Sequence, residues 1–370
     1  MLHSVWQRIV IKVGSALISP NAKGCSTRYL LAIARFINEC RQQGIEVVLV
    51  SSGSVAAGRS AIAFAHQPLP INIKQAMAAV GQTEMMATWS HLFDFRCAQI
   101  LLTHDDLADR RRYLNIDNTL RTLLENQVLP IVNENDSVAT AELRVGDNDN
   151  LAAMVAILVD ADALIICSDI DGLYTANPRT NPDAEFIPKV DAINQDIYAM
   201  AGGSHHAIGT GGMTTKIQAA DKATRQGVDT LIVNGQKAEC FEALLRGDPA
   251  GTLFVRQLDR QSAKKHWLQH SLKSQGSILL DSGAVQALLH KGASMLAKGI
   301  TAVQGQFDKG DAIWLCDSSG KQLAKGICQY SATELQLIKG VHSQQISEIL
   351  GCCPSEEVVH RDDIALINLR

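Results

Sequence analysis

Residues 45–54 read Ile-Glu-Val-Val-Leu-Val-Ser-Ser-Gly-Ser, and this segment says most about the architecture of the chain. The apolar, β-branched run at residues 45–50 is typical of a strand that is covered on both faces in a parallel sheet. Hydroxyl groups and a glycine follow at once, as in a turn from a strand into a helix. Because such sheets bind ligands beyond the carboxyl ends of their strands, this segment predicts an α/β fold and the edge that carries its chemistry.

The same alternation of strand and helix extends along the first two thirds of the chain. It predicts an open, mainly parallel sheet with helices on both faces. Ser26 or Thr27 is expected to cap the first long helix, and Gly44 to end it. The expected strands are residues 8–13, 45–50, 97–103, 129–132, 163–167 and 230–233, and the expected helices are 28–40, 113–125 and 151–158.

The last third of the chain has a different pattern. A basic and polar stretch near residues 256–276 contains no sheet-like segment, and short apolar runs punctuated by glycine follow it at residues 277–280, 299–305, 312–315 and 323–328. We therefore expect a first domain at residues 1–257, a linker at 258–275 and a small β-rich domain at 276–370.

Composition narrows the class of protein. The chain has 370 residues, 46% of them hydrophobic, and a formal net charge of −4, which gives no general attraction for nucleic acid or anionic membranes. The start of the chain lacks the pattern of a signal peptide, and no apolar run reaches the ~20 residues of a membrane span. Nine cysteines occur without the spacing of a zinc site. We expect a cytoplasmic protein that does not contact membranes.

A glycine-rich segment predicts phosphate binding. Residues 209–216 read Gly-Thr-Gly-Gly-Met-Thr-Thr-Lys and precede an amphipathic run. Glycine lets backbone N–H groups approach an anion closely, the helix that follows directs its positive end toward it, and lysine adds a full charge. The spacing is not that of a Walker A loop. A surface loop that binds nothing is the alternative interpretation.

Other polar groups follow the predicted strands. Lys12 lies near the end of the first predicted strand. The hydroxyls of residues 51–54 could hold a carboxylate or phosphate, or Ser52 or Ser54 could simply cap a helix. Residues 133–136 and 147–150 together hold eight carboxylate or amide side chains. Such a cluster could bind an ammonium group or a metal, or orient a lysine, although Asn148 or Asp149 could also be a plain helix cap.

This inventory suits phosphoryl transfer, which needs positioning and positive charge around the moving group rather than covalent work by the protein. Residues 168–174 end another predicted strand and could contact a nucleotide, or form an ordinary Asp-Gly turn. Hydrolase signatures such as G-x-S-x-G and H-E-x-x-H are absent from the sequence. The G-x-G-x-x-G of a dinucleotide-binding fold is also missing after the first strand.

Seven motifs taken in order resemble the amino-acid kinase family over residues 8–256, and the tail resembles a PUA domain. The motifs are I-K-V-G-S, V-S-S-G-S-V-A-A-G, A-V-G-Q, N-E-N-D, V-G-D-N-D-N-L, D-G-L-Y-T-A-N-P-R and G-T-G-G-M-T-T-K. The resemblance implies ATP-dependent phosphorylation of the side-chain carboxylate of L-glutamate to L-glutamyl 5-phosphate, the first step of proline biosynthesis. Ser51 and Ser168 stand where the family commonly has threonine, and both retain the hydroxyl.

The resemblance also implies a role for each site residue. Lys12 and Lys216 would stabilise charge on the transferring group and Asp149 would orient them. Mg²⁺ would bridge the phosphates of ATP, held largely by phosphate oxygens and water rather than by a protein metal site. The residues that would hold glutamate are Ser52, Asp136 and Asn148, and those that would contact ATP are Lys12, Ser168, Asp169, Thr210, Gly211, Gly212, Met213, Thr214, Thr215 and Lys216.

Partners and alternatives follow from the same resemblance. It implies feedback inhibition by proline at the loop of residues 133–147, assembly into a homo-oligomer (dimer or tetramer), and functional coupling to glutamyl-phosphate reductase. The substrate could instead be aspartate or N-acetylglutamate, although Asp136 suits a free ammonium group. RNA binding through the tail is a further alternative, but the tail offers only a sparse basic face, and we do not expect nucleic acid as a partner.

Overall fold

The computed structural model describes residues 6–21, 24–62, 64, 68–138, 148–202, 212–257, 273–351 and 355–367. The chain divides into two compact units, residues 1–260 and 261–370. The limits of the domains and of the linker remain a prediction. Among the helices that the structure describes, none has both the length and the apolar character to cross a bilayer.

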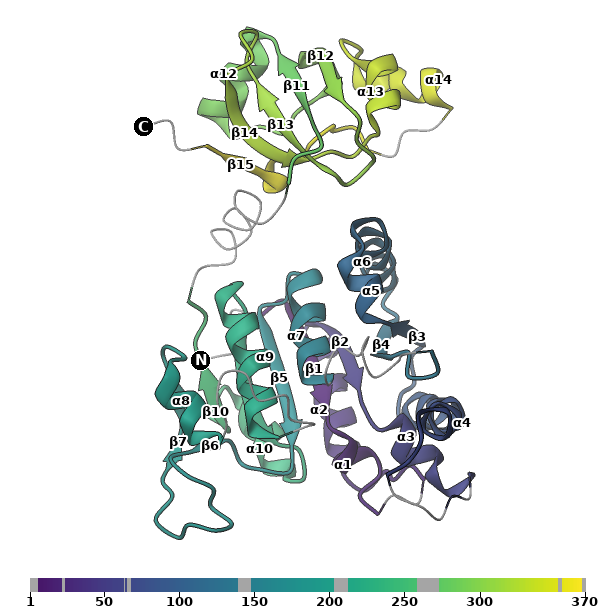
Figure 1. Cartoon of the computed structure of the whole chain (residues 1–370), viewed down its shortest axis with the longest axis vertical. Helices are drawn as coiled ribbons and strands as arrows, with labels where there is room; N and C mark the ends of the chain where they lie inside the picture. The colour runs from purple at the N-terminus through teal and green to yellow at the C-terminus, as the bar shows by residue number, and fades with distance from the viewer. Residues whose placement is uncertain are drawn as a thin grey trace. The chain divides into compact units, whose positions relative to one another are not determined.

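The first unit is built on an eight-stranded sheet with the order β3-β4-β2-β1-β5-β9-β10-β8 (Figure 1). All its neighbouring strands run parallel except β10, which is antiparallel to β9. The predicted mainly parallel sheet is therefore confirmed. Its strands are β1 (Arg8–Val13), β2 (Glu46–Ser51), β3 (Cys97–Leu102), β4 (Leu129–Glu134), β5 (Ala163–Ser168), β8 (Lys189–Val190), β9 (Asp229–Asn234) and β10 (Thr252–Phe254).

Helices cover both faces of this sheet because its central strands are apolar on both sides. Val10 packs in the core beneath α6 (Arg110–Glu125), α7 (Asn148–Leu158) and α9 (Met213–Arg225). Ile11 packs in the opposite core, beneath α2 (Leu30–Gln42), α4 (Ile71–His91) and α10 (Ala238–Arg246). Successive strand residues face opposite sides, so Lys12 shares the α7 and α9 face with Val10. Figure 1 shows these two helices side by side.

Shorter elements join the layers. The turns that follow β1 and β2 lead into one-turn helices, and the segment after β5 forms a two-stranded hairpin. They are α1 (Ser15–Ile18), α3 (Ser54–Ala57), the 3₁₀ turn η1 (Gly58–Ser60), α5 (His104–Ala108), β6 (Leu173–Tyr174), β7 (Phe186–Ile187) and α8 (Gln195–Met200).

Two expectations about helix ends were wrong. Helix α2 starts at Leu30 after Tyr29, and no side chain caps it, because the Ser26 hydroxyl accepts instead from the backbone N–H of Arg28. Its end was predicted well, since Gly44 adopts φ +78° just beyond it. Helix α9 begins at Met213, so Lys216 lies within the first turn rather than ahead of the helix.

Two glycines bring α4 into close contact with the α3–η1 segment. A Cβ added to Gly81 would lie 1.9 Å from the carbonyl oxygen of Ser54, and one added to Gly58 would lie 1.9 Å from that of Met77. Neither position has space for a side chain, so the backbones pack directly against each other. This contact fixes where the turn after β2 lies above the sheet.

The second unit has its own five-stranded sheet, with the order β12-β11-β13-β14-β15, and its own hydrophobic core. The predicted β-rich domain is confirmed, but β15 and the three helices of this unit were not predicted. Its elements are β11 (Gly276–Leu280), α12 (Ser282–Lys291), η2 (Ala297–Gly299), β12 (Ile300–Gly305), β13 (Ala312–Cys316), β14 (Gln322–Ile327), α13 (Ala332–Ile338), η3 (Ser343–Gln345), α14 (Ile346–Leu350), η4 (Arg361–Asp363) and β15 (Ile364–Leu366).

Candidate active site

Three charged side chains from three elements meet on the α7 and α9 face of the sheet. Lys12 Nζ at the end of β1 lies 2.5 Å from Asp149 Oδ1, and Lys216 Nζ in the first turn of α9 lies 3.0 Å from Asp149 Oδ2. The Asp149 side chain has no exposed surface, and each lysine side chain exposes only 7% of its own. Lys216 is 67 residues away from Asp149 in the sequence, and Lys12 is still more distant, yet their two ammonium groups share this one carboxylate at the carboxyl edge of the sheet.

Electrostatics keep this carboxylate ionised. Burial by itself would raise the pKa of Asp149, but the charges of Lys12 and Lys216 outweigh it and lower that pKa from 3.8 to about 2. The hydroxyl of Thr215 also lies 3.0 Å from Asp149 Oδ2, as a hydrogen-bond donor. With two lysines and one aspartate, the cluster carries a net positive charge, which suits an incoming phosphate group.

The turn after β2 lies near the loop after β4. Gly53 adopts φ +100° at the start of α3, and neither Ser52 nor Ser54 caps that helix with its side chain. Instead, the Ser54 hydroxyl donates a hydrogen bond of 2.8 Å to Asp136 Oδ2. Ser52 is half-buried and its backbone N–H bonds the carbonyl of Val13, which ties this turn to the end of β1. The alternative of a simple serine cap is thus wrong.

Three amide side chains form a hydrogen-bonded polar region next to this turn and loop. Asn148 Nδ2 donates to the backbone oxygen of Ser51 at 3.1 Å and to Asn133 Oδ1 at 2.7 Å. Asn133 Nδ2 donates in turn to Gln82 Oε1 at 2.8 Å. Gln82 lies on α4 in the A-V-G-Q motif, and sequence reasoning gave it no role. Its place in a motif was the only available signal, because its partner lies 51 residues further along the chain.

The side chain of Ser51 contacts other protein side chains rather than the polar region of the site. Its buried hydroxyl accepts a hydrogen bond of 3.1 Å from Trp89 Nε1 and lies 3.1 Å from the sulfur of Met85, which is a weak acceptor. Both partners belong to α4, so this hydroxyl ties α4 to β2. In the polar region, it is the backbone oxygen of Ser51 that accepts a hydrogen bond, from Asn148, and not its side chain.

A second ionic group lies after β5 and β9. The Ser168 hydroxyl donates to Asp169 at 3.3 Å, and Asp169 pairs with Arg179 at 2.9 Å, not with Lys12 or Lys216. Asp171 pairs with Lys237 at 2.6 Å. The hydrogen bond from Lys237 is the main reason that the pKa of Asp171 lies below its ordinary value. Both pairs are largely exposed, and we call these four charged residues the outer pairs.

The remaining residues of the predicted nucleotide contact lie at the start of α9. Gly212 precedes the helix, and Met213, Thr214 and Thr215 form its first turn with Lys216. Thr210 and Gly211 lie outside the described residues, as do positions 139–147 of the predicted inhibitor loop. Among the residues that the structure describes, no group of three or more His, Cys, Asp or Glu could hold a metal ion.

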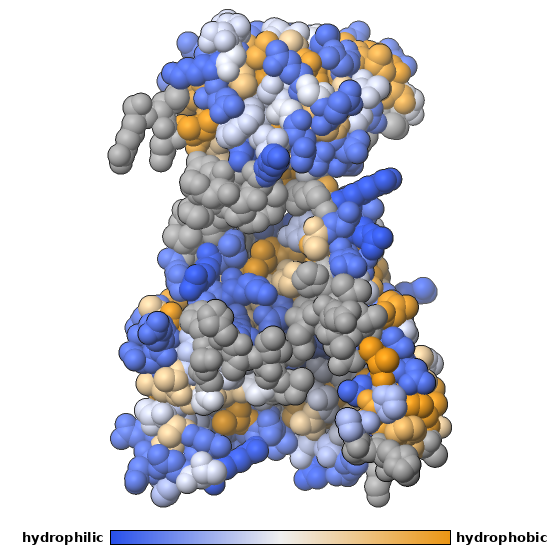
Figure 2. Space-filling view, in the orientation of Figure 1, coloured by the Kyte–Doolittle hydropathy of each residue, from blue (hydrophilic) through white to orange (hydrophobic). Residues whose placement is uncertain are grey.

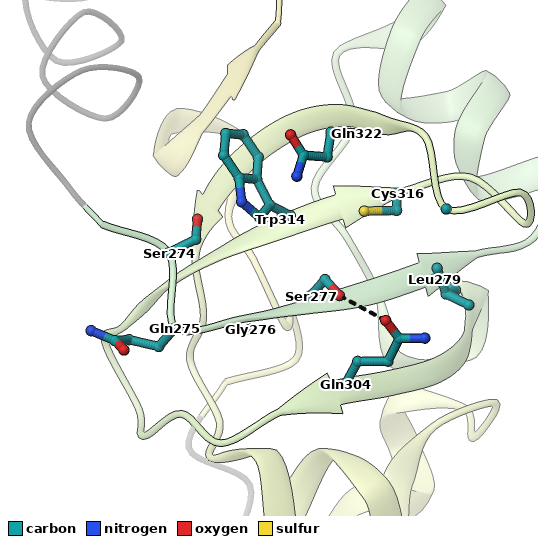
Figure 3. A pocket seen from close by; sticks show the side chains of 10 residues that line it. Ser274, Gln275, Gly276, Ser277, Leu279, Gln304, Trp314, Cys316 and Gln322 are labelled. Atoms are coloured by element: carbon teal, nitrogen blue, oxygen red, sulfur yellow. Dashed lines mark hydrogen bonds between the residues drawn. The ribbon is translucent and has the colours of Figure 1, made fainter.

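The second unit has a pocket of about 340 Å³ on one face of its sheet (Figure 3). Figure 3 shows Trp314 standing beside Gln322, with Ser277 bonded to Gln304. The described residues that line it are polar or apolar, and none of them is charged. The ammonium group of Lys325 lies 4.6 Å from the centre of the Trp314 ring.

Comparison with known proteins gives consistent matches. The sequence profile of the amino acid kinase family matches residues 7–234, and that of the PUA domain matches residues 276–350. The chain is 60% identical to a glutamate 5-kinase of Idiomarina loihiensis over 98% of both chains. It is 52% identical to a glutamate 5-kinase of Salinibacter ruber over 98% of this chain and 97% of that protein. A solved UMP kinase from Bacillus anthracis covers 68% of this chain and 97% of its own, at 15% identity and a TM-score of 0.47.

Proposed function

This chain belongs to the amino acid kinase family, and we propose that it transfers the terminal phosphoryl group of ATP to the side-chain carboxylate of L-glutamate. The product is L-glutamyl 5-phosphate, the starting point of proline biosynthesis. The observation that carries the proposal is the buried cluster of Lys12, Asp149 and Lys216. Two full-length relatives that are named glutamate 5-kinase support the choice of substrate.

The buried cluster accounts for the chemistry. ATP supplies the phosphoryl group, and Mg²⁺ on its phosphates neutralises part of the charge; we propose both as cofactors. Lys12 and Lys216 stabilise the negative charge that develops on the oxygens of the moving group. Asp149 holds both ammonium groups in place, so little reorganisation is needed when the reaction begins. Ser168 and Asp169, together with Gly212 to Thr215, contact the nucleotide.

The turn after β2 and the loop after β4 form the glutamate site. Asp136 pairs with the α-ammonium group, Ser52 with its N–H groups receives a carboxylate, and Asn148 supplies an amide. Asp136 favours a substrate with a free amine over N-acetylglutamate. The same loop is where we propose that proline binds as a feedback inhibitor, because proline also carries an ammonium and a carboxylate.

Helix α4 and the edge strand β3 are the surface that we propose for self-assembly into a dimer or tetramer. On α4, Ile71 exposes 41% and Val80 42% of its surface. Hydrophobic residues gather on that side of the first unit in Figure 2, and apolar patches of this kind mark interfaces. Coupling to glutamyl-phosphate reductase and a cytoplasmic location complete the proposal, since the acyl phosphate product is labile and ATP and glutamate are cytoplasmic metabolites.

An assay across three acids tests the function. Purified protein with ATP and Mg²⁺ is given glutamate, aspartate or N-acetylglutamate, and hydroxylamine traps the acyl phosphate. We expect trapped product with glutamate and at least about 100-fold less with either other acid. N-acetylglutamate has no ammonium group to pair with Asp136, and aspartate keeps the ammonium group but is one methylene too short to bring its side-chain carboxylate to the same place. Equal or greater turnover of another acid would replace glutamate as the substrate. Inhibition by proline at limiting glutamate is measured in the same assay.

A further inference from the structure

We propose that a chain of three amides, Gln99, Gln82 and Asn133, fixes the orientation of Asn148 so that its side-chain carbonyl oxygen recognises the α-ammonium group of the substrate. This inference rests on the proposed function, which assigns Asn148 to the glutamate site. Gln82 and Asn133 are then positioning residues that act through Asn148 without touching the substrate.

Backbone groups settle the orientation of two of these amides independently. Asn133 Oδ1 accepts from the backbone N–H of Glu134 at 2.9 Å. An N–H group can only donate, so the atom that faces it is oxygen. The backbone oxygen of Ser51 can only accept, so the Asn148 atom that lies 3.1 Å from it is nitrogen. The bond of 2.7 Å from Asn148 Nδ2 to Asn133 Oδ1 agrees with both assignments.

The remaining chemistry of Asn148 follows from this orientation. An amide nitrogen carries two hydrogens, and both are directed into the protein, one to Ser51 and one to Asn133. Asn148 thus has only its carbonyl oxygen to offer to a ligand. At neutral pH both carboxylates of L-glutamate accept hydrogen bonds, and the α-ammonium group is its only donor. Asn148 therefore selects for the amine and supplements the charge of Asp136.

Gln82 fixes the orientation of the Asn133 amide from its other side. Its Oε1 accepts from Asn133 Nδ2 at 2.8 Å, and its Nε2 donates to Gln99 Oε1 at 3.2 Å. Asn133 is 1% exposed and Gln82 8% exposed, so water has little access to correct a mismatch. If the Asn133 amide turned over, its NH₂ group would face the NH₂ group of Asn148. Its oxygen would then face the side-chain oxygen of Gln82. That arrangement is unfavourable because buried polar groups need partners.

The test uses a matched pair at Asn133 and two substrates. Asn133→Leu removes the acceptor, whereas Asn133→Asp keeps an oxygen facing Glu134 and Asn148, and Gln82 can turn over to donate its Nε2 to the second carboxylate oxygen. Each variant is assayed with L-glutamate and with glutarate, which has both carboxylates but no amine. We expect Asn133→Leu to lower the preference for glutamate about tenfold, through a higher KM for glutamate, with the KM for ATP changed less than about twofold. Asn133→Asp should restore the preference to within about threefold.

A second pair keeps the inference falsifiable if Asn133→Leu folds poorly, which its circular dichroism spectrum would reveal. Gln82→Leu should lower the preference about threefold, and Gln82→Glu, which still accepts from Asn133, should leave it unchanged. The inference is overturned if the leucine variants lose activity on both acids equally, or if the carboxylate variants lose as much preference as the leucine variants do. Wild-type protein that phosphorylates neither acid would instead overturn the proposed function itself.

Discussion

The buried cluster and the outer pairs both join basic side chains to aspartates in segments that follow the strands of one sheet, yet their surroundings differ. The Lys12 and Lys216 side chains expose 7% of their surface and Asp149 none. In the outer pairs, Lys237 exposes 53% and Arg179 71%. Water screens an exposed pair, while a buried one keeps nearly the full strength of its field. Burial, more than the number of charges, thus separates ions whose field stays strong from ions whose field is screened by water.

The largest difference should appear in turnover. Lys216→Ala should lower kcat about 1000-fold and change the KM for glutamate by less than about threefold, because the lysine acts on charge that develops in the transition state. Lys237→Ala, the matched change in the outer pairs, should alter kcat less than about threefold. Steady-state kinetics of both variants measure the contrast. Similar losses in the two would mean that burial does not set their importance.

Stability should show a smaller difference in the same direction. Asp149→Asn leaves two buried ammonium groups without their counter-charge and should lower the free energy of unfolding by about 3 kcal/mol. Asp171→Asn should cost less than about 1 kcal/mol, since its partner can turn to water. Urea unfolding followed by circular dichroism measures both. ATP with Mg²⁺ should restore part of the loss in Asp149→Asn, because its phosphates replace the missing charge.

The smallest expected effect is on the stability of the fold at acidic pH. Because the pKa of Asp149 is lowered from 3.8 to about 2 in the folded state, its ionised form stabilises the fold above about pH 4, and this contribution is lost as the pH falls toward 2. The stability advantage of wild-type protein over Asp149→Asn should therefore shrink by about 2 kcal/mol across that window. Unfolding curves at several pH values measure it. A constant advantage from pH 4 to pH 2 would contradict the assignment.

The sequence predicted the sheet well because its strands carry their own signal. The runs at β1, β2 and β5 are short, mainly apolar and rich in β-branched residues, as is typical of strands covered on both faces. Helix α4 was missed because apolar and small residues lie all around it, so it lacks a clear polar face. Strand β10 was missed because it is only three residues long and antiparallel to β9.

The candidate site could be predicted only as a set of residue types. Lysine at a strand end and aspartate at the start of a helix were both recognised, and the structure brings Lys12 and Asp149 together. Their roles stay a prediction. The orientation of Asn148 was out of reach of the sequence, because it depends on Asn133 and on Gln82, which lie 15 and 66 residues away in the chain. Hydrogen-bond direction is a property of the assembled fold.

The glycine contact between α4 and the α3–η1 segment sets a limit on how this protein can be altered. A complete substitution library at Gly58 and Gly81 should recover almost no active members, since even alanine would place a carbon atom 1.9 Å from a backbone oxygen. Side chains around the turn can therefore be substituted to change the choice of substrate, but Gly58 and Gly81 cannot.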